Sequence, residues 1–525
     1  MLFAAAGTLI AAGGCARGAR GARYPTEPRD SRTIRLSIPA RLGGFGVQRS
    51  HQDYPAQLAA LVYDGLTLVD ERGEIQPGLA RSWDVSGAGS RYTFHLRTNV
   101  RFHDGTKFTA ADVERSWRSA LRQGVRRRTH PWMLDAIVGA GALAAGQTSR
   151  LAGVRVIDDS TIEVTLARPL APFPAMISLP QAAVTAVAAD DQRLIGTGPW
   201  RWASGAPDDD QIWLARSPGY WGEQPKLDSL VLRVVPDTES VTALESGWVD
   251  FSLEAVVQGG PALAARSDLG FLRSAPAALL RLIINCREPL FADVRVRQAL
   301  NYAIDAGALQ QFISREDAVR FAGVIPPGWP GADSTLSPFP YDPVRARRLV
   351  QEAHFPADRM IQLWVARTEE GEETDRIGAL LVGYLEAIGL HVQLHREAQV
   401  DDAMSLGNAD LVLRGWYPDY RDADTYLYPL FHSSAGGSAG NPGSFSDPLA
   451  DTLIDASRGE VDPARRVALL RRANDRVYEQ AANVFLGFSR LQAAFSLRLA
   501  GWSVSPFLSR YTTVDFPAVP GVARP

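Results

Sequence analysis

The chain has 525 residues, of which 46% are hydrophobic and 22% are charged, and these are ordinary values for a globular protein. Its 55 Lys and Arg residues against 58 Asp and Glu residues give a formal net charge of -3, which argues against nucleic acid as a partner. The length suggests about three domains, or two large ones, and the two cysteines, Cys15 and Cys286, exclude a disulfide framework and a CxxC-type zinc site.

The N-terminus reads as an export signal. Residues 2–14 (LFAAAGTLIAAGG) are apolar or small, too few to span a bilayer but suited to the core of a signal peptide. Residues 12–15 (AGGC) resemble a bacterial lipobox, in which the cysteine is lipidated; the alternatives are a plain signal peptide and an irregular N-terminus. We therefore expect a signal peptide with a lipobox over residues 1–15, a lipid on Cys15, and a flexible tether over the Arg-, Gly- and Pro-rich residues 16–31.

The globular pattern begins near Thr33. Thr109 followed by Asp112 resembles a capping box at the start of a helix. Alternating apolar residues or β-rich runs predict the strands of the N-terminal half. These expected strands are Thr33–Ile38, Arg91–Leu96, 154–157, 161–166, 212–215 and 230–235.

The C-terminal half alternates strands with helices. The expected strands are 280–285, 361–365, 390–394 and 411–413. Helical spacing predicts helices over 294–304 and 377–388. Asp462 and Pro463 open a further long helix, in which we expect Val467, Leu470 and Val477 to face inward. The architecture is therefore mixed α/β in at least two lobes.

No catalytic constellation stands out, because HExxH and Walker A motifs are both missing. Residues 139–144 (GAGALA) approximate a dinucleotide fingerprint, the only support for an enzyme. The residues that follow build no suitable helix, and Asp158 and Asp159 fall in a hairpin turn, so we expect neither an enzyme nor a cofactor. His391 and His395 share one face of a strand, which favours a solvated face over a metal site.

Several sequence blocks resemble one family. They are 61–66 (LVYDGL), 77–80 (PGLA), 92–97 (YTFHLR), 100–105 (VRFHDG), 108–113 (FTAADV), 196–200 (GTGPW), 218–221 (PGYW), 293–300 (DVRVRQAL) and 415–420 (GWYPDY). These blocks occur in the order typical of the large extracytoplasmic solute-binding proteins of ABC importers, family 5, which includes oligopeptide- and dipeptide-binding lipoproteins. The resemblance runs from about residue 33 to the C-terminus.

The resemblance implies an α/β, bilobal fold of the periplasmic-binding-protein type with an extra domain and a two-crossing hinge. Lobe I is expected over 32–55, 190–273 and 497–525, the additional domain over 56–189 and lobe II over 274–496. The two crossings, near residues 273 and 496, would let the lobes close over a ligand.

The block at 415–420 is the best candidate for ligand contact, since it follows a strand and places aromatic residues and an acid in a short loop. In peptide-binding members of the family an acid at this position accepts the ligand's ammonium group, and that role carries over to Asp419. Trp416, Tyr417 and Tyr420 would pack on the ligand. The alternative is that Asp419 satisfies the loop backbone and Trp416 fills the core. Arg414 adjoins the motif in a register that differs from the basic residue of peptide binders, so the partner of a peptide carboxylate stays open.

The predicted function is that of an extracytoplasmic, membrane-anchored receptor that captures short peptides for an ABC importer and delivers them to the permease. We expect a monomer without metal or cofactor. The alternatives are the same role for a non-peptide solute, such as a nickel complex or an oligosaccharide, and a sensor or chaperone that kept the fold.

Overall fold

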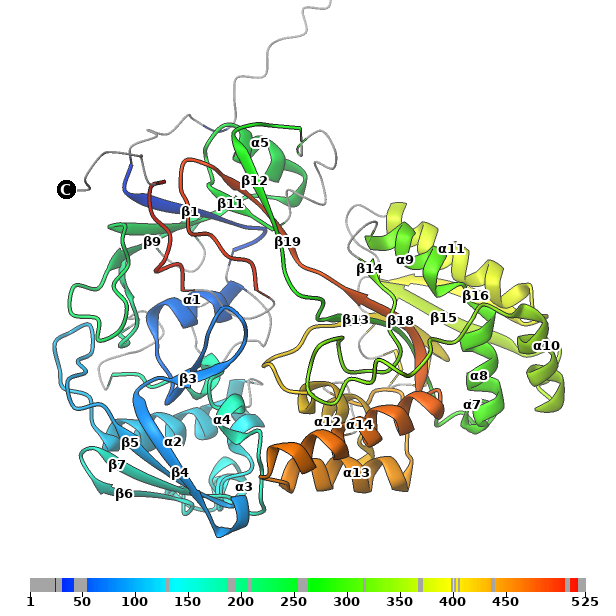
Figure 1. The fold of residues 1–525 in the computed structure, drawn as a ribbon, viewed down its shortest axis with the longest axis horizontal. Helices are drawn as coiled ribbons and strands as arrows, with labels where there is room; N and C mark the ends of the chain where they lie inside the picture. Colours follow the sequence, from blue (N-terminus) through cyan, green and yellow to red (C-terminus); the bar gives the residue numbers. More distant parts are fainter. Residues whose placement is uncertain are drawn as a thin grey trace, which may run out of the picture.

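The computed structural model organises the chain into two lobes, each built on one large sheet, and a third part beside the first lobe (Figure 1). It describes residues 24, 31–41, 54–127, 132–186, 195–205, 209–253, 263, 265–314, 318–366, 372–397, 400, 403–404, 407–435, 440–505 and 510–517. The expected lipidation site, Cys15, lies outside these residues. In the described part of the chain, no helix is both long enough and apolar enough to cross a membrane.

Lobe I contains a seven-stranded sheet in the order β12-β19-β11-β1-β10-β9-β8. Its strands are β1 (Thr33–Ile38), β8 (Trp200–Ser204), β9 (Gln211–Arg216), β10 (Ser229–Val234), β11 (Phe251–Ser252), β12 (Leu269–Arg273) and β19 (Gln492–Ser496). Strand β1 lies between β10 and β11 and runs parallel to both, and five of its six residues are buried. The strands predicted at Thr33–Ile38, 212–215 and 230–235 are therefore confirmed, to within a residue at their ends. Helix α5 (Ser240–Glu245) lies in the same lobe.

Helix α1 (Tyr54–Val62) packs on lobe I, because Leu58, Leu61 and Val62 share a hydrophobic cluster with Trp200 and the residues of β1. The boundary expected at residue 56 is therefore too early. The core of the additional domain begins at Leu66, and the physical reason is that the apolar face of α1 is buried against the lobe I sheet.

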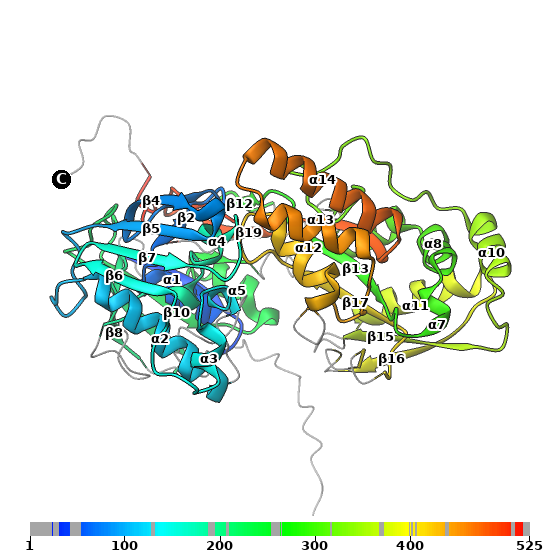
Figure 2. The same cartoon turned by 90° about the horizontal axis from the view of Figure 1, so that it is seen from below.

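The additional domain is built on an antiparallel four-stranded sheet in the order β4-β5-β7-β6 (Figure 2). Its elements are β2 (Thr67–Val69), β3 (Ile75–Pro77), β4 (Ala80–Ser86), β5 (Arg91–Leu96), α2 (Ala110–Arg127), α3 (Ala140–Ala144), β6 (Val154–Asp158), β7 (Thr161–Thr165) and α4 (Phe173–Met176). The expected capping box at the start of α2 is confirmed, since the backbone N–H of Thr109 donates to Oδ2 of Asp112 at 2.9 Å. The helix within the glycine-rich segment, α3, has only five residues, far too few for a dinucleotide-binding helix.

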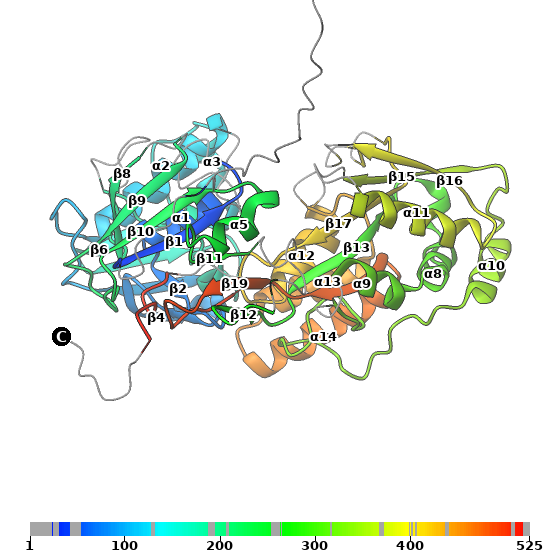
Figure 3. The same cartoon turned by 90° about the horizontal axis from the view of Figure 1, so that it is seen from above.

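Lobe II contains a six-stranded sheet in the order β14-β18-β13-β17-β15-β16. Figure 3 shows its strands β13, β17, β15 and β16 beside helices α8, α10 and α11. Its strands are β13 (Ala278–Ile284), β14 (Ala318–Val319), β15 (Met360–Ala366), β16 (His391–Glu397), β17 (Leu411–Trp416) and β18 (Asn483–Ser489). Its helices are α7 (Pro289–Ala292), α8 (Val294–Ala303), α9 (Ala306–Ser314), α10 (Pro343–Glu352), α11 (Glu372–Glu386), α12 (Asp424–Phe431), α13 (Pro448–Gly459) and α14 (Pro463–Glu479).

Helices cover both faces of the lobe II sheet. Leu282, Ile284 and Leu413 belong to a cluster with residues of α8, α9, α10 and α11, whereas Leu279 belongs to a second cluster with residues of α12, α13 and α14. The helix predicted from Asp462 is confirmed, and the Asp462 carboxylate caps it by accepting from the backbone N–H of Arg465. Leu470 and Val477 are buried as expected.

The expected burial of Val467 is wrong, whereas the expected environment of His391 and His395 agrees with the structure. Val467 of α14 is 40% exposed, contrary to our expectation, because the buried face of the helix follows Leu470, Ala473 and Val477 and Val467 lies at its edge. His391 is exposed and His395 stacks on Trp364 with ring centroids 4.9 Å apart, in agreement with the interpretation of a partly solvated strand face.

The chain passes between the lobes twice, at 274–277 and at 490–491, and the two crossings lie side by side (Figure 1). The backbone N–H of Ser274 donates to the carbonyl of Leu491 at 2.9 Å, and the N–H of Leu491 donates to the Ser274 hydroxyl at 3.0 Å. The second crossing therefore precedes the expected boundary at residue 496. The reason is that β19 pairs with β11 and β12 and so belongs to the sheet of lobe I.

The additional domain also contacts lobe II. The backbone N–H of Ala171 donates to the carbonyl of Arg458 in α13 at 2.7 Å, and Trp132 lies against Tyr420 with ring centroids 6.3 Å apart. Arg168 and Asp455 add an ion pair at 3.7 Å. Lobe II is thus joined to the rest of the molecule by the two crossings and by a contact remote from them along the chain.

Candidate functional site

The segment 415–420 begins with the last two residues of β17, Gly415 and Trp416, at the end of that strand nearest the crossings. Trp416 is the register partner of Leu279, which is the second residue of β13 after the first crossing. Its indole N–H donates to the carbonyl of Thr425 at 3.0 Å, and its ring is half-buried against the cluster of α12, α13 and α14. Gly415 is exposed, and a Cβ atom at this position would meet nothing within 4 Å. The structure therefore places this segment at a surface with open space beside it.

Asp419 has an unusual environment for a carboxylate. Its backbone N–H donates to the hydroxyl of Thr425 at 3.2 Å, which fixes the loop. The surrounding protein desolvates the side chain, although it keeps some exposure, and this burial raises the pKa of the carboxyl from 3.8 to about 7. In the part of the chain that the structure describes, no cationic side chain contributes to this shift. A cationic group brought by a ligand would relieve the cost of ionising Asp419.

The two tyrosines of the segment have different surroundings. Tyr417 is 39% exposed, and desolvation by the surrounding protein raises its pKa. Tyr420 is 1% exposed; its hydroxyl donates to Oδ2 of Asp424 at 2.9 Å and its ring packs into the core of the additional domain. In this arrangement Tyr420 joins lobe II to the additional domain and presents almost no surface to a ligand. Of the four predicted ligand-contact residues, the structure groups Trp416, Tyr417 and Asp419 at a partly open surface and sets Tyr420 apart.

Ion pairs brace the chain directly after the segment. Arg466 of α14 binds both carboxylate oxygens of Asp422 at 2.7 Å, and Arg458 of α13 lies 3.1 Å from Asp424. Arg421 contacts Glu74 of the additional domain. Burial raises the pKa of Asp424, and the Arg458 guanidinium opposes that shift. Sequence reasoning missed the two arginines of the helices, because their partners lie more than 30 residues away; the acids that follow the motif are the only local signal.

Three of the family-like blocks meet at a second buried centre. The Asp64 carboxylate is fully buried and accepts hydrogen bonds from the Thr197 hydroxyl and the Trp221 indole, both at 2.8 Å. Arg510 neutralises it, with Nη1 2.5 Å from Oδ1. A Cβ atom on Gly196 would collide with the backbone of Val62, which explains the glycine at that position. These blocks therefore join the start of the additional domain to lobe I.

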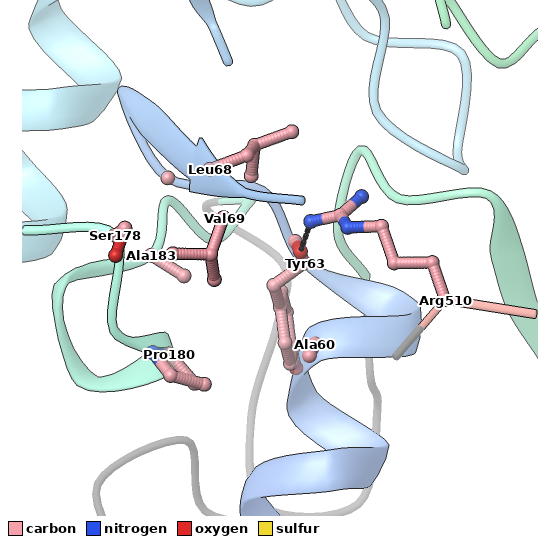
Figure 4. A pocket seen from close by; sticks show the side chains of 9 residues that line it. Ala60, Tyr63, Leu68, Val69, Ser178, Pro180, Ala183 and Arg510 are labelled. Atoms are coloured by element: carbon pink, nitrogen blue, oxygen red, sulfur yellow. Dashed lines mark hydrogen bonds between the residues drawn. The ribbon is translucent and has the colours of Figure 1, made fainter. Parts of the chain in front are cut away.

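A small pocket lies beside this centre (Figure 4). It is lined by Ala60, Tyr63, Gly65, Leu68, Val69, Ser178, Pro180, Ala183 and Arg510. The Arg510 guanidinium donates to the Tyr63 carbonyl at 3.2 Å across one side of it. Val69, on the opposite side, also packs against the lobe II cluster that includes Trp416. The residues that line the pocket therefore come from lobe I and the additional domain, and one of them, Val69, also packs against lobe II.

Cys286, the cysteine within the described residues, follows β13 and is partly buried. Burial raises the pKa of its thiol to about 11, which disfavours the thiolate at neutral pH.

The comparisons with known proteins agree with this architecture. A family model described as "Bacterial extracellular solute-binding proteins, family 5 Middle" matches residues 74–438, which is more than half of the chain. The chain is 28% identical over 475 residues to the glutathione-binding protein GsiB of Pectobacterium atrosepticum, covering 86% of this chain and 87% of that protein. It is also 28% identical over 462 residues to heme-binding protein A of Haemophilus influenzae, covering 83% of this chain and 82% of that protein.

A solved structure shows the same fold. The periplasmic binding protein DppA of Helicobacter pylori, in complex with the peptide STSA, superposes with a TM-score of 0.77 at 22% identity, covering 92% of this chain and 98% of that chain. The two sheets, the two crossings and the additional domain therefore form the bilobal fold that the sequence blocks implied. The chain belongs to family 5 of the bacterial extracellular solute-binding proteins.

Proposed function

We propose that the protein is the extracytoplasmic receptor of an ABC importer and that it captures short peptides by closure of lobe II against lobe I and the additional domain. It binds its ligand without transforming it and hands it to the permease as a monomer. The observation that carries the peptide assignment is Asp419, a desolvated carboxylate at a partly open surface with no described cationic partner. The terminal ammonium group of a peptide is a fitting counter-ion.

One relative supports this proposal by its name, and the name of another points to the alternative, a ligand that is not a peptide. Glutathione, in the name of one relative, is a tripeptide, whereas heme, in the name of the other, is not a peptide. A heme ligand carries no ammonium group for Asp419, and so the chemistry of the segment favours the peptide. Trp416 and Tyr417 would pack on the peptide. Tyr420 would contact Trp132 of the additional domain when the lobes close.

We further propose that the mature protein is anchored to a membrane by a lipid on Cys15 and that residues 16–31 form the tether. A lipid anchor keeps a receptor close to its permease without a membrane-spanning segment.

Thermal unfolding in the presence of a di- and tripeptide library tests the function, because a ligand that binds the native state raises its apparent stability. We expect a shift with free-amine peptides and none with their N-acetylated forms. Stabilisation by hemin or by an oligosaccharide, with none by any peptide, would overturn the peptide assignment.

A further inference from the structure

One residue of the expected tether is buried against lobe I. Residues 16–31 (ARGARGARYPTEPRDS) contain one aromatic residue, Tyr24, and no leucine, isoleucine, valine or methionine. A segment of this composition is not expected to contact the fold, because it has too little apolar surface to offset the entropy of ordering. Tyr24 is the exception, since it belongs to the described part of the chain and is only 8% exposed.

The site that receives Tyr24 combines an aromatic ring with a carboxylate. The ring of Tyr24 stacks on the indole of Trp248, with centroids 5.7 Å apart and 25° between the planes. Its hydroxyl donates to Oε2 of Glu239 at 2.6 Å, a charge-assisted hydrogen bond. The two rings share a hydrophobic cluster with buried residues of α5, β12 and β19, which are Ala243, Leu244, Leu269 and Ala494. We call Trp248, Glu239 and these four residues the Tyr24 site.

Lobe I builds the Tyr24 site from its own residues. Arg233 of β10 is 2% exposed and donates from Nη1 to the carbonyl of Trp248 at 2.6 Å. Its guanidinium carbon also lies 3.8 Å from the centroid of the indole, a cation–π contact. Glu239 directly precedes α5, and Trp248 follows that helix by three residues. Because the indole and the carboxylate are fixed in this way, little further entropy is lost when a tyrosine binds to them.

We propose that Tyr24 docks the tether on lobe I, so that only residues 16–23 separate the lipid on Cys15 from the fold. This inference rests on the proposed anchor at Cys15 and not on the identity of the ligand. An extended chain spans at most about 3.5 Å per residue, which limits the distance from Cys15 to the docked Tyr24 to roughly 30 Å. Without docking, the limit would be set by Ser31, whose carbonyl accepts from Arg498, and would be roughly 55 Å.

Docking would hold one end of lobe I close to the membrane. Helix α5, which the Tyr24 site adjoins, lies at the end of lobe I opposite the additional domain (Figure 1). A tether of about half the length raises the effective concentration of a tethered partner by roughly two- to threefold. The receptor would therefore meet a permease in the same membrane more often, without any new contact between the two proteins.

Tryptic cleavage of the tether tests the docking, because a protease cleaves a segment at a rate set by the population that is free of the fold. Arg17, Arg20 and Arg23 recur every third residue and offer three similar bonds, of which the bond after Arg23 adjoins Tyr24. A stacked ring and a charge-assisted hydrogen bond should make cleavage after Arg23 slower than after Arg20 by about tenfold or more. Mass spectrometry of timed digests of the purified protein measures both rates.

Variants of the Tyr24 site leave the sequence of the tether unaltered. Cleavage after Arg23 should accelerate in Trp248→Ala to the rate of the preceding arginine, and it should accelerate to a smaller extent in Glu239→Gln. Tyr341→Ala, which removes a ring that is 44% exposed in lobe II, is the matched control and should keep the protection. Equal rates at the two arginines in the wild type would overturn the docking and leave both the peptide function and the lipid anchor standing.

Neutron reflectometry of the lipidated protein on a supported bilayer tests the length of the tether. The protein layer of Tyr24→Ala should extend further from the bilayer than that of the wild type, by up to roughly 25 Å. Equal layers, with Arg23 protected in the wild type, would overturn the short tether. If the protein carries no lipid but Arg23 is protected in a manner that depends on Trp248, the Tyr24 site stands and the proposed anchor falls.

Discussion

The carboxylate of Asp64 forms an ion pair at 2.5 Å with the guanidinium of Arg510, 446 residues further along the chain. Arg510 also donates to the hydroxyl of Tyr220 at 3.0 Å, so three distant parts of the sequence are fixed at one buried point. Desolvation raises the pKa of Tyr220, with the negative charge of Asp64 as a further cause. The joint between lobe I and the additional domain therefore depends on a residue close to the C-terminus.

Replacement of Arg510 by Met should destabilise the protein. It leaves the Asp64 carboxylate buried without its counter-charge, and loss of one partner of a buried pair costs about 3–5 kcal/mol. Urea unfolding followed by tryptophan fluorescence measures the change. Arg348→Met, which breaks an exposed pair with Glu352, is the control and should cost about 0.5 kcal/mol or less. Equal unfolding midpoints for the two variants would contradict the assignment of Asp64 and Arg510 as a structural joint.

The unliganded protein should lose stability as the pH rises towards neutrality. The folded-state pKa of Asp419, about 7, lies above its ordinary value of 3.8. The stabilisation is therefore complete below that ordinary value and is lost as the pH rises through about 7, with a ceiling of about 4 kcal/mol that the partial exposure of the side chain reduces. Asp419→Asn should remove this part of the pH dependence. Unfolding free energies that fall equally in both proteins across this range would count against it.

Peptide affinity should change with pH in the opposite direction. A ligand ammonium pairs with the ionised carboxylate, so affinity should rise by about tenfold or more between about pH 5.5 and 7.5, while the terminal amine stays mostly protonated. Calorimetry at the two values measures this change. Asp419→Asn should bind weakly at both, and an unchanged affinity in that variant would exclude Asp419 from the site.

Tyr420→Ala should open the molecule. The tyrosine ring, 1% exposed, seats lobe II against Trp132 of the additional domain, and an aromatic contact of this kind contributes about 0.5–1.5 kcal/mol beyond its buried area. Small-angle X-ray scattering should therefore report a larger radius of gyration for the unliganded variant, together with weaker peptide binding. Tyr417→Ala, at a position that is 39% exposed in the same segment, should weaken binding with no change in scattering. If the two variants scatter alike, Tyr420 has no part in closure.

Cys15→Ser should release the protein from membranes. The proposed lipid is attached through the thiol, and a lipid chain supplies about 0.8 kcal/mol of membrane affinity for each buried methylene. Fractionation of cells, combined with metabolic labelling by a fatty acid, measures both events. Cys286→Ser is the matched control because that thiol is partly buried within lobe II. Membrane association that persists in Cys15→Ser points to a different anchor.

Most of the elements could be predicted from local pattern. Alternation identified Thr33–Ile38 and Arg91–Leu96, and the capping residues of α2 and α14 marked where those helices begin. Such signals succeed because the pitch of a helix and the pleat of a strand depend on residues within a few positions of one another. Val467 shows the limit of such local signals. Helical spacing identified the apolar face of the helix, but it did not indicate how wide a part of that face packing would bury.

The candidate site could be predicted only in part from the sequence. The motif itself drew attention to Trp416, Tyr417 and Asp419, and the structure groups them. It could not reveal that Tyr420 turns towards the additional domain, or that Arg414 meets Arg281 across a strand pair. Both facts depend on which strands and domains become neighbours, and no local pattern carries that information.

The sequence by itself determined the family, the presence of two α/β lobes and the segment that contains Asp419, because each of these is encoded in short blocks of contiguous residues. Only the tertiary structure decided the domain boundary at 490–491, the Asp64–Arg510 joint and the burial of Tyr24. The physical reason is that the first set reflects local backbone preferences and side-chain chemistry. The second set arises from strand register, desolvation and charge pairing between residues that meet only when the chain is folded.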